Sequence, residues 1–302
     1  MPNDANYDCM IEEDSWPGTL PTDRCFFGAR GRGIDLVLWG DSHGMALSPL
    51  LLALQQNGAP TFLQLTMGNC LPLAQQSAGS AKPSNPCAEF NRQVLQEILQ
   101  LKMRGLKGVV LAGRWIKIWD PALSPYYLPP GAPGVRDLLK TWIGRSDRRR
   151  QAAIPAVDRL TADLGATLEI VQNAGLKVFV FLDPPDLPWP LSNCVYFDFS
   201  DLSRCGISHA EYNFQAAQII EVTEALASRF ASVRVFNPMQ YLCNAPTCPP
   251  FIDGRPILWD RHHMSASTAR SFGPILANDF RWLVGSEMPA PVAAPGAGHT
   301  GP

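Results

Sequence analysis

Charge is scarce in this chain of 302 residues, and long apolar runs are absent. Charged residues make up 17% and hydrophobic residues 46%, and the formal net charge is −2. This composition argues against a disordered chain, which would combine few apolar residues with a high net charge. It also supplies no general attraction to nucleic acid or to an anionic membrane surface. We therefore expect a globular protein, with no nucleic-acid partner.

The sequence contains neither a predicted membrane span nor a predicted export signal. No run approaches the roughly 18 consecutive apolar residues of a spanning helix. The opening MPNDANYDCM has no basic start and no apolar stretch. Residues 286–302, rich in Pro, Ala and Gly, resemble a flexible tail. We divide the chain into an irregular arm (1–30), one domain (31–285) and this tail.

Motifs for metals and cofactors are also missing. There is no Cys-x-x-Cys and no clustering of Cys with His at zinc-site spacing. The glycine-rich stretch GARGRG, residues 28–33, precedes a predicted strand instead of following one, which is the wrong order for a phosphate loop. We predict that the protein uses no cofactor.

Cysteine, in contrast, is abundant. The eight cysteines fall in four pairs along the chain: Cys9/Cys25, Cys70/Cys87, Cys194/Cys205 and Cys243/Cys248. Because eight thiols allow about 105 pairings, bonding between sequence neighbours is only the simplest hypothesis. We expect disulfides and an oxidising compartment, with reduced structural cysteines as the alternative. Together with the missing export signal, this predicts a piece of a longer exported or membrane-tethered protein.

Short apolar runs alternate with helical patterns. Continuous apolar runs, typical of parallel strands covered on both faces, occupy residues 34–39, 61–65, 108–112, 177–182 and 233–236. Helical patterns occupy residues 45–56, 86–104, 156–173, 209–230 and 266–284. This order predicts a three-layer α/β/α sandwich with a five-stranded parallel sheet, whose ligands bind at the carboxyl ends of the strands. Two segments rich in Pro and aromatics, 116–155 and 183–208, are expected to lie over those ends.

The stretch LVLWGDSHGM, residues 36–45, ends the first predicted strand and begins a helix. Ser42 would lie at the active edge of the sheet, where N–H groups of the following turn can face a developing oxyanion. The alternative is that Asp41 or Ser42 merely caps the helix. His43 is a poor base for Ser42, because the side chains of sequence neighbours diverge.

A better base lies in ILWDRHHMS, residues 257–265. Asp260 and His263 are three residues apart, which in a helical turn places both on one side. The carboxylate could then orient the imidazole and stabilise its protonated form. His262 is the competing base, but its spacing from Asp260 is less favourable.

These blocks resemble the SGNH (GDSL-like) hydrolase superfamily, which has a flavodoxin-like α/β/α fold. More closely, the chain resembles the periplasmic C-terminal SGNH domain of bacterial acyltransferase family 3 membrane proteins, which O-acetylate surface polysaccharides. The resemblance covers residues 9–285 and is carried by GDSH (40–43), NCLPL (69–73), VVLAGRW (109–115) and DRHHMS (260–265). Cysteine-flanked loops are typical of the periplasmic members.

The resemblance implies a catalytic triad. Ser42 would be the nucleophile, His263 the general base and then acid, and Asp260 the orienting carboxylate. Ser42 N–H and Gly68 would contribute to the oxyanion hole. The superfamily's third block supplies an asparagine there, but this chain has AGRW (112–115) and no asparagine. Arg114 is the nearest candidate donor, or else a structural arginine paired with a carboxylate such as Asp41.

Four further residues are candidates for substrate binding: Asp41, His43, Trp115 and Trp189. Each has an alternative: a hydrogen-bonding role in the turn for Asp41, hydrogen bonding within the site for His43, and packing for the tryptophans.

Three functions remain open at this point. The first is O-acetyl transfer to a glycan hydroxyl through acyl-Ser42, with acetyl supplied by a membrane acyltransferase domain of an inner-membrane parent protein. The others are a carbohydrate O-acetylesterase and a non-catalytic glycan-binding module. The expected location is the periplasm, and the isolated chain is expected to be monomeric.

Overall fold

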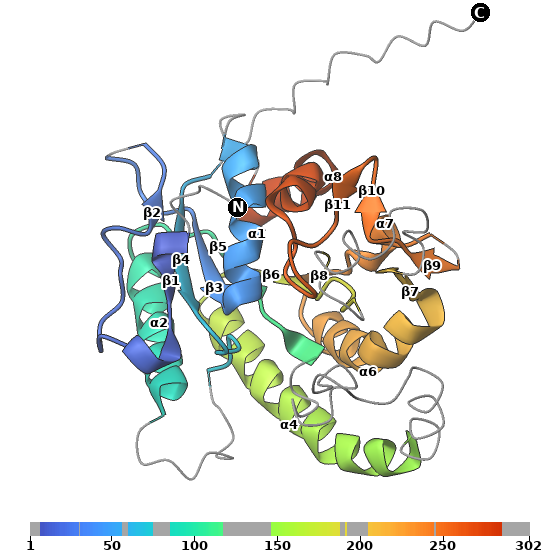
Figure 1. Ribbon diagram of the computed structural model, residues 1–302. Helices are drawn as coiled ribbons and strands as arrows, with labels where there is room; N and C mark the ends of the chain where they lie inside the picture. Colours follow the sequence, from blue (N-terminus) through green and yellow to red (C-terminus); the bar gives the residue numbers. More distant parts are fainter. Residues whose placement is uncertain are drawn as a thin grey trace, which may run out of the picture.

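The computed structural model describes residues 7–29, 31–55, 60–74, 85–116, 146–187, 191, 205–244 and 246–285. Its centre is a twisted sheet with strand order β1-β4-β3-β5-β6-β8, with β2 also paired to β4 (Figure 1). The strands are β1 (Met10–Ile11), β2 (Phe26–Phe27), β3 (Leu36–Gly40), β4 (Phe62–Met67), β5 (Gly108–Ala112), β6 (Lys177–Phe181) and β8 (Val233–Phe236). Five of these strands, β4, β3, β5, β6 and β8, run parallel to one another, which confirms the predicted fold class.

Helices cover both faces of this sheet. On one face lie α1 (Ser42–Gln55) and α8 (Ala266–Val284); on the other lie α2 (Pro86–Lys102), α4 (Ser146–Asn173) and α6 (His209–Ser228). Leu36 and Leu38 of β3 pack toward the first pair, whereas Val37 and Trp39 pack toward the second group. Every residue of β3, β4 and β5 is buried. Burial on both faces explains why these strands are continuous apolar runs in the sequence.

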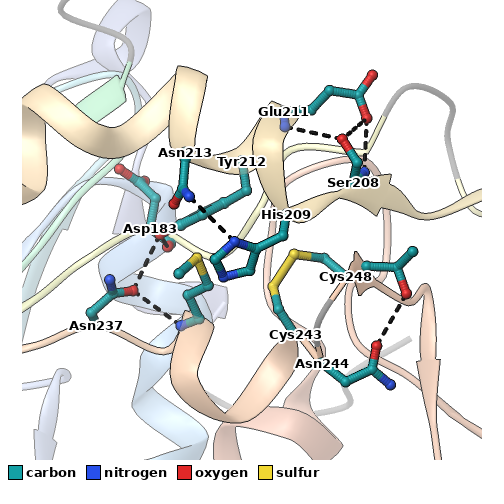
Figure 2. The surroundings of a disulfide bond; sticks show 12 residues. Asp183, Ser208, His209, Glu211, Tyr212, Asn213, Asn237, Cys243, Asn244 and Cys248 are labelled. Atoms are coloured by element: carbon teal, nitrogen blue, oxygen red, sulfur yellow. Dashed lines mark hydrogen bonds between the residues drawn. A yellow bond between two sulfur atoms is a disulfide. The ribbon is translucent and has the colours of Figure 1, made fainter.

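Side chains cap the helices where the sequence predicts it. The Asn85 carboxamide accepts the N–H of Ala88 at the start of α2 (3.1 Å). Ser208 and Glu211 form the predicted capping box at the start of α6, which Figure 2 shows. The boundary of α4 differs, because this helix begins at Ser146 and not near residue 156. The added turns contain Arg, Gln and Ala, which are strong helix formers.

The N-terminal arm joins the sheet through two short segments. Both β1 and β2 pair with β4, and a disulfide between Cys9 and Cys25 connects them. The remaining elements are short: η1 (Tyr7–Cys9), η2 (Glu13–Ser15), β7 (Ile207–Ser208), α7 (Met239–Leu242), β9 (Thr247–Cys248), β10 (Phe251–Ile252) and β11 (Arg255–Pro256).

Two further disulfides join cysteines that follow one another in the sequence, Cys70 with Cys87 and Cys243 with Cys248. Figure 2 shows the second of them. Cys205 is disulfide-bonded as well, and its predicted partner Cys194 lies outside the described residues. Among the helices that the structure describes, none has the length and apolar character needed to span a bilayer.

Glycine allows the end of β3 to approach β5 closely. A Cβ on Gly40 would collide with the carbonyl oxygen of Ala112, and a Cβ on Gly44 would lie 3.0 Å from the same atom. The first turn of α1 therefore sits directly against the end of β5. This contact fixes where Ser42, between the two glycines, emerges from the sheet.

The close approach at Gly40 makes a direct prediction. Gly40→Ala should lower the free energy of unfolding by about 3 kcal/mol, because the neighbouring atom is a backbone carbonyl that cannot move aside easily. Gly33→Ala is the matched control, since the nearest atom to its added Cβ would be 3.9 Å away. Urea denaturation followed by circular dichroism compares the two. Equal stabilities would contradict this account of the β3–β5 contact.

Candidate active site

Ser42 is the first residue of α1, immediately after β3 and Asp41. Asp41 is 1% exposed, and both of its carboxylate oxygens accept backbone N–H groups: that of His43 at 2.8 Å and that of Arg114 at 2.9 Å. Asp41 thus supports the turn and ties it to the chain after β5. These bonds give Asp41 the hydrogen-bonding role in the turn that was the alternative to substrate binding.

Asp260 and His263 lie in a loop and not in the helical turn that their spacing suggested. Leu258 and Met264 pair as an antiparallel bridge, and the Trp259 N–H donates to the His263 carbonyl (3.1 Å). Inside this loop, Asp260 Oδ1 accepts the N–H groups of His262 and His263 at 2.9 and 2.8 Å. An aspartate that binds the N–H two residues on is a turn-forming arrangement. The loop therefore brings the two side chains together without a helix.

Three side chains from the two ends of the chain form one hydrogen-bonded line. Ser42 Oγ lies 2.8 Å from His263 Nε2, and His263 Nδ1 lies 2.6 Å from Asp260 Oδ2. This is the order of contacts found in hydrolytic triads, with hydroxyl, imidazole and carboxylate in sequence. The His263 side chain is 13% exposed, so the line is sheltered but reachable from solvent.

Asp260 is held as a carboxylate. Partial burial raises its pKa, but hydrogen bonding to the His263 side chain, the charge of that ring and the two backbone N–H groups outweigh burial. The pKa of Asp260 is consequently well below its ordinary value. A permanent negative charge at Nδ1 favours the Nδ1-protonated tautomer and stabilises the imidazolium form.

His262 lies beside the triad but does not contact Ser42. Its Nδ1 is 3.1 Å from His43 Nε2, and the two rings are stacked with planes 2° apart. Burial, followed by the positive charges of His263 and Arg114, lowers the pKa of His262 to about 3. His262 is therefore neutral near pH 7. The spacing argument that preferred His263 over His262 agrees with this geometry.

His43 is mostly buried between two polar partners. It is 7% exposed, and its Nδ1 lies 3.4 Å from Asp183 Oδ1. Burial raises the pKa of Asp183 well above its usual range. The Tyr212 hydroxyl lies 3.3 Å from the Asp183 carbonyl and fixes this end of β6 (Figure 2).

A small pocket lies next to His43 at the carboxyl ends of β5 and β6. Its volume is about 10 Å³, room for one methyl-sized or water-sized group. The residues lining it are mainly apolar: His43, Leu47, Ala112, Gly113, Phe181, Leu182, Pro184 and Met264. Pro184 belongs to the stiff segment after β6, part of the region expected over the strand ends.

The oxyanion donors differ from the expected set. Ser42 opens α1, and N–H groups in a first turn have no partner within the helix. The N–H of Gly68 instead donates to the Ile11 carbonyl at 2.7 Å, in continuation of the β1–β4 ladder. Gly68 is therefore unavailable as a donor, because an arm strand distant in sequence occupies that edge. Arg114 Nη2 donates to Asp186 Oδ2 (2.6 Å), so its side chain pairs with Asp186 and not with Asp41.

The tryptophans also differ from expectation. Trp115 is fully buried and its indole N–H donates to the Phe181 carbonyl (2.9 Å), so it packs the core and cannot stack on a sugar. Trp189 lies outside the described residues. The sequence reasoning missed Trp259, which is 46% exposed and stacks on His263 with ring centroids 5.4 Å apart. Its position one residue before Asp260 was the available signal.

Comparisons with known proteins agree with this architecture. A comparison with curated protein sequences finds no match. Among solved structures, the chain is similar to the lipopolysaccharide acetyltransferase periplasmic domain of Salmonella ser. Paratyphi A, with 16% sequence identity and a TM-score of 0.56 over 90% of each chain. At this identity the likeness concerns the fold.

The sequence of the whole domain carries the family assignment. The family model described as "SGNH domain (fused to AT3 domains)" matches residues 8–278, which include Ser42, Asp260 and His263. The match begins within the N-terminal arm, whose strands complete the sheet edge. The chain therefore belongs to the family of SGNH domains that are fused to AT3 domains.

Proposed function

We propose that this domain transfers an O-acetyl group to a hydroxyl of a bacterial surface glycan through an acyl-Ser42 intermediate. The observation that carries the proposal is the hydrogen-bonded line from Ser42 through His263 to Asp260. Membership in a family fused to AT3 domains supports a partner that delivers acetyl groups from the membrane. The disulfides support an oxidising compartment, which for this family is the periplasm.

The first half-reaction uses all three side chains. Ser42 Oγ attacks the carbonyl carbon of the acetyl donor while His263 Nε2 takes the hydroxyl proton. Asp260 remains a carboxylate and stabilises the imidazolium. When the tetrahedral intermediate collapses, the bond from the acetyl carbon to the donor's leaving group breaks, and His263 gives its proton to that leaving group. Acetyl-Ser42 and the deacetylated donor result.

The second half-reaction runs in the opposite direction with a new alcohol. A glycan hydroxyl gives its proton to His263 Nε2 and attacks the acetyl carbon. Collapse of the second intermediate breaks the bond to Ser42 Oγ, which receives the proton back from His263. Water in place of the glycan hydroxyl would give acetate, so an acetylesterase shares every step up to this point.

The oxyanion would be stabilised by fewer neutral donors than in the wider superfamily. Ser42 N–H is one donor, and the proposed second is a guanidinium N–H of Arg114 other than the one that Asp186 accepts. Removal of a single oxyanion donor in other enzymes costs on the order of 10²–10³ in rate. We infer that the domain on its own hydrolyses esters slowly.

The surroundings of the triad support a small acyl group and a sugar acceptor. The small, mainly apolar pocket beside His43 has room for a group the size of the methyl of an acetyl group. Trp259 offers an exposed indole next to His263. Aromatic faces commonly pack on the apolar faces of sugar rings, and this one would hold the acceptor near the base.

The triad makes the first prediction of function. Wild-type protein exposed to p-nitrophenyl acetate should gain one acetyl group on Ser42, detected by intact-mass and peptide mass spectrometry. Ser42→Ala and His263→Ala should lower the rate by at least about 10³-fold. His209→Ala is the matched control, because His209 on α6 contacts Asn213 and not the triad. If wild type shows neither turnover nor adduct, the isolated domain has a binding or partner-dependent role and the proposed acyl transfer by the domain alone fails.

The second prediction of function concerns the exposed indole of Trp259. Trp259→Ala should raise KM for a glycan acceptor about tenfold, and should affect acetylation of Ser42 by p-nitrophenyl acetate much less. Trp259→Phe retains an aromatic face and should recover most of the loss. Steady-state transfer assays with increasing glycan concentration test this. An equal loss in both variants, or a change confined to kcat, would rule out stacking on the acceptor.

Neutral His262 makes a prediction about pH. Its pKa is 6.5 when unperturbed and about 3 in the folded protein, so between these values the unfolded chain binds more protons. The contribution of His262 to the unfolding free energy is therefore fully present above about pH 6.5 and is lost as the pH falls toward 3. His262→Gln should show a smaller loss of unfolding free energy between pH 7 and pH 5 than wild type. Urea denaturation at both pH values measures it, with His209→Gln as the control that should behave as wild type.

A further inference from the structure

Three imidazoles converge at the active site, although a triad needs only one. His43 belongs to the first turn of α1, whereas His262 and His263 belong to the loop before α8. One nitrogen atom from each ring lies within 4.8 Å of the nitrogen atoms of the other two. Neither the proposed acyl transfer nor the packing of the core requires this arrangement.

The spacing suits a tetrahedral transition-metal ion. Bonds of about 2.0–2.1 Å from zinc to imidazole nitrogen place neighbouring ligand atoms about 3.3 Å apart. His43 Nε2 and His262 Nδ1 already lie 3.1 Å apart. His263 Nε2 completes the set and also faces Ser42 Oγ at 2.8 Å. A small widening of the cluster would let three nitrogen atoms and one oxygen atom surround an ion.

One of the rings is backed by a carboxylate as metal ligands usually are, and a second ring lies near a carboxylate. A ligating histidine typically directs its second ring nitrogen to a carboxylate or carbonyl, which fixes the ring and the tautomer. His263 Nδ1 faces Asp260 Oδ2 at 2.6 Å, and His43 Nδ1 faces Asp183 Oδ1 at 3.4 Å. With Nδ1 protonated in both rings, both Nε2 lone pairs point into the cluster. His262 Nδ1 then donates to His43 Nε2 at 3.1 Å, so metal binding requires the proton of His262 to move from Nδ1 to Nε2.

The position of His262 is fixed through its backbone. The backbone N–H of His262 donates to Asp260 Oδ1, and the other oxygen of the same carboxylate orients His263. The nearby cation Arg114 is paired with Asp186, so its charge is partly offset. The cluster therefore combines fixed ligands with a surrounding that tolerates a divalent cation.

We propose that His43, His262 and His263 bind a divalent transition-metal ion of the zinc type, and that this ion blocks the acyl-transfer site reversibly. The ion would occupy the Nε2 lone pair of His263, which then cannot accept the proton of Ser42. The blocking part rests on the proposed function, whereas metal binding by the cluster does not.

Binding is tested on the whole chain without a polyhistidine tag. Isothermal titration with Zn²⁺ should give one site per chain, and Co²⁺ should give the visible absorption of a tetrahedral complex. His262→Gln and, separately, His43→Gln should each weaken binding at least tenfold, with circular dichroism confirming the fold. His209→Gln should bind as wild type does. Absence of binding at millimolar Zn²⁺, or binding that neither cluster substitution changes, overturns the proposal.

Inhibition is measured separately. Zn²⁺ at saturating concentration should slow acetylation of Ser42 by p-nitrophenyl acetate at least tenfold, and excess EDTA should restore the rate. Metal binding with undiminished acetylation would overturn the blocking role alone. If the protein binds zinc at the cluster but never acetylates Ser42, the proposed acyl transfer fails while the metal site stands.

Discussion

The two hydrogen bonds accepted by the Asp41 carboxylate hold the active edge of this domain together. One comes from the N–H of His43 and turns the chain from β3 into α1; the other comes from the N–H of Arg114 and fixes the chain leaving β5. Both lie in a nearly dry environment, where such bonds are stronger and their loss is costly. Gly40 makes this junction possible by letting the two strand ends meet. The position of Ser42 follows from these contacts.

The second half of the site depends on a different carboxylate. Asp260 uses one oxygen to shape its own loop and the other to orient His263. Loop shape and imidazole orientation are thus coupled through one side chain. Because α1 and α8 pack side by side on one face of the sheet, the two halves approach each other at a fixed distance (Figure 1). Small errors in such distances reduce reaction rates strongly.

Much of this architecture could be predicted from the sequence, because the relevant signals are local. Strands buried on both faces are continuous apolar runs, and Asn85, Ser208 and Ser265 mark helix starts through their own side chains. The partnership of Ser42 with His263 rested on two short motifs.

The predictions that were wrong concern residues whose contacts are made with parts of the chain distant in sequence. The Gly68 N–H is taken by Ile11, and Trp115 is drawn into the core, and neither motif contains a sign of this. The loop around Asp260 was expected to be helical because spacing alone cannot distinguish a helical turn from a loop closed by the Leu258–Met264 bridge.

The site is assembled from the two ends of the domain, with Ser42 and His263 separated by 221 positions in sequence. A ribosome has made Ser42 long before it makes His263, and α8, which packs on α1, is complete only at Val284. Ser42 therefore lacks the imidazole that it contacts in the folded domain during most of the chain's synthesis. An unfinished or truncated chain carries Ser42 without its hydrogen-bond partner His263, so the line from Ser42 to Asp260 forms only when the fold is complete.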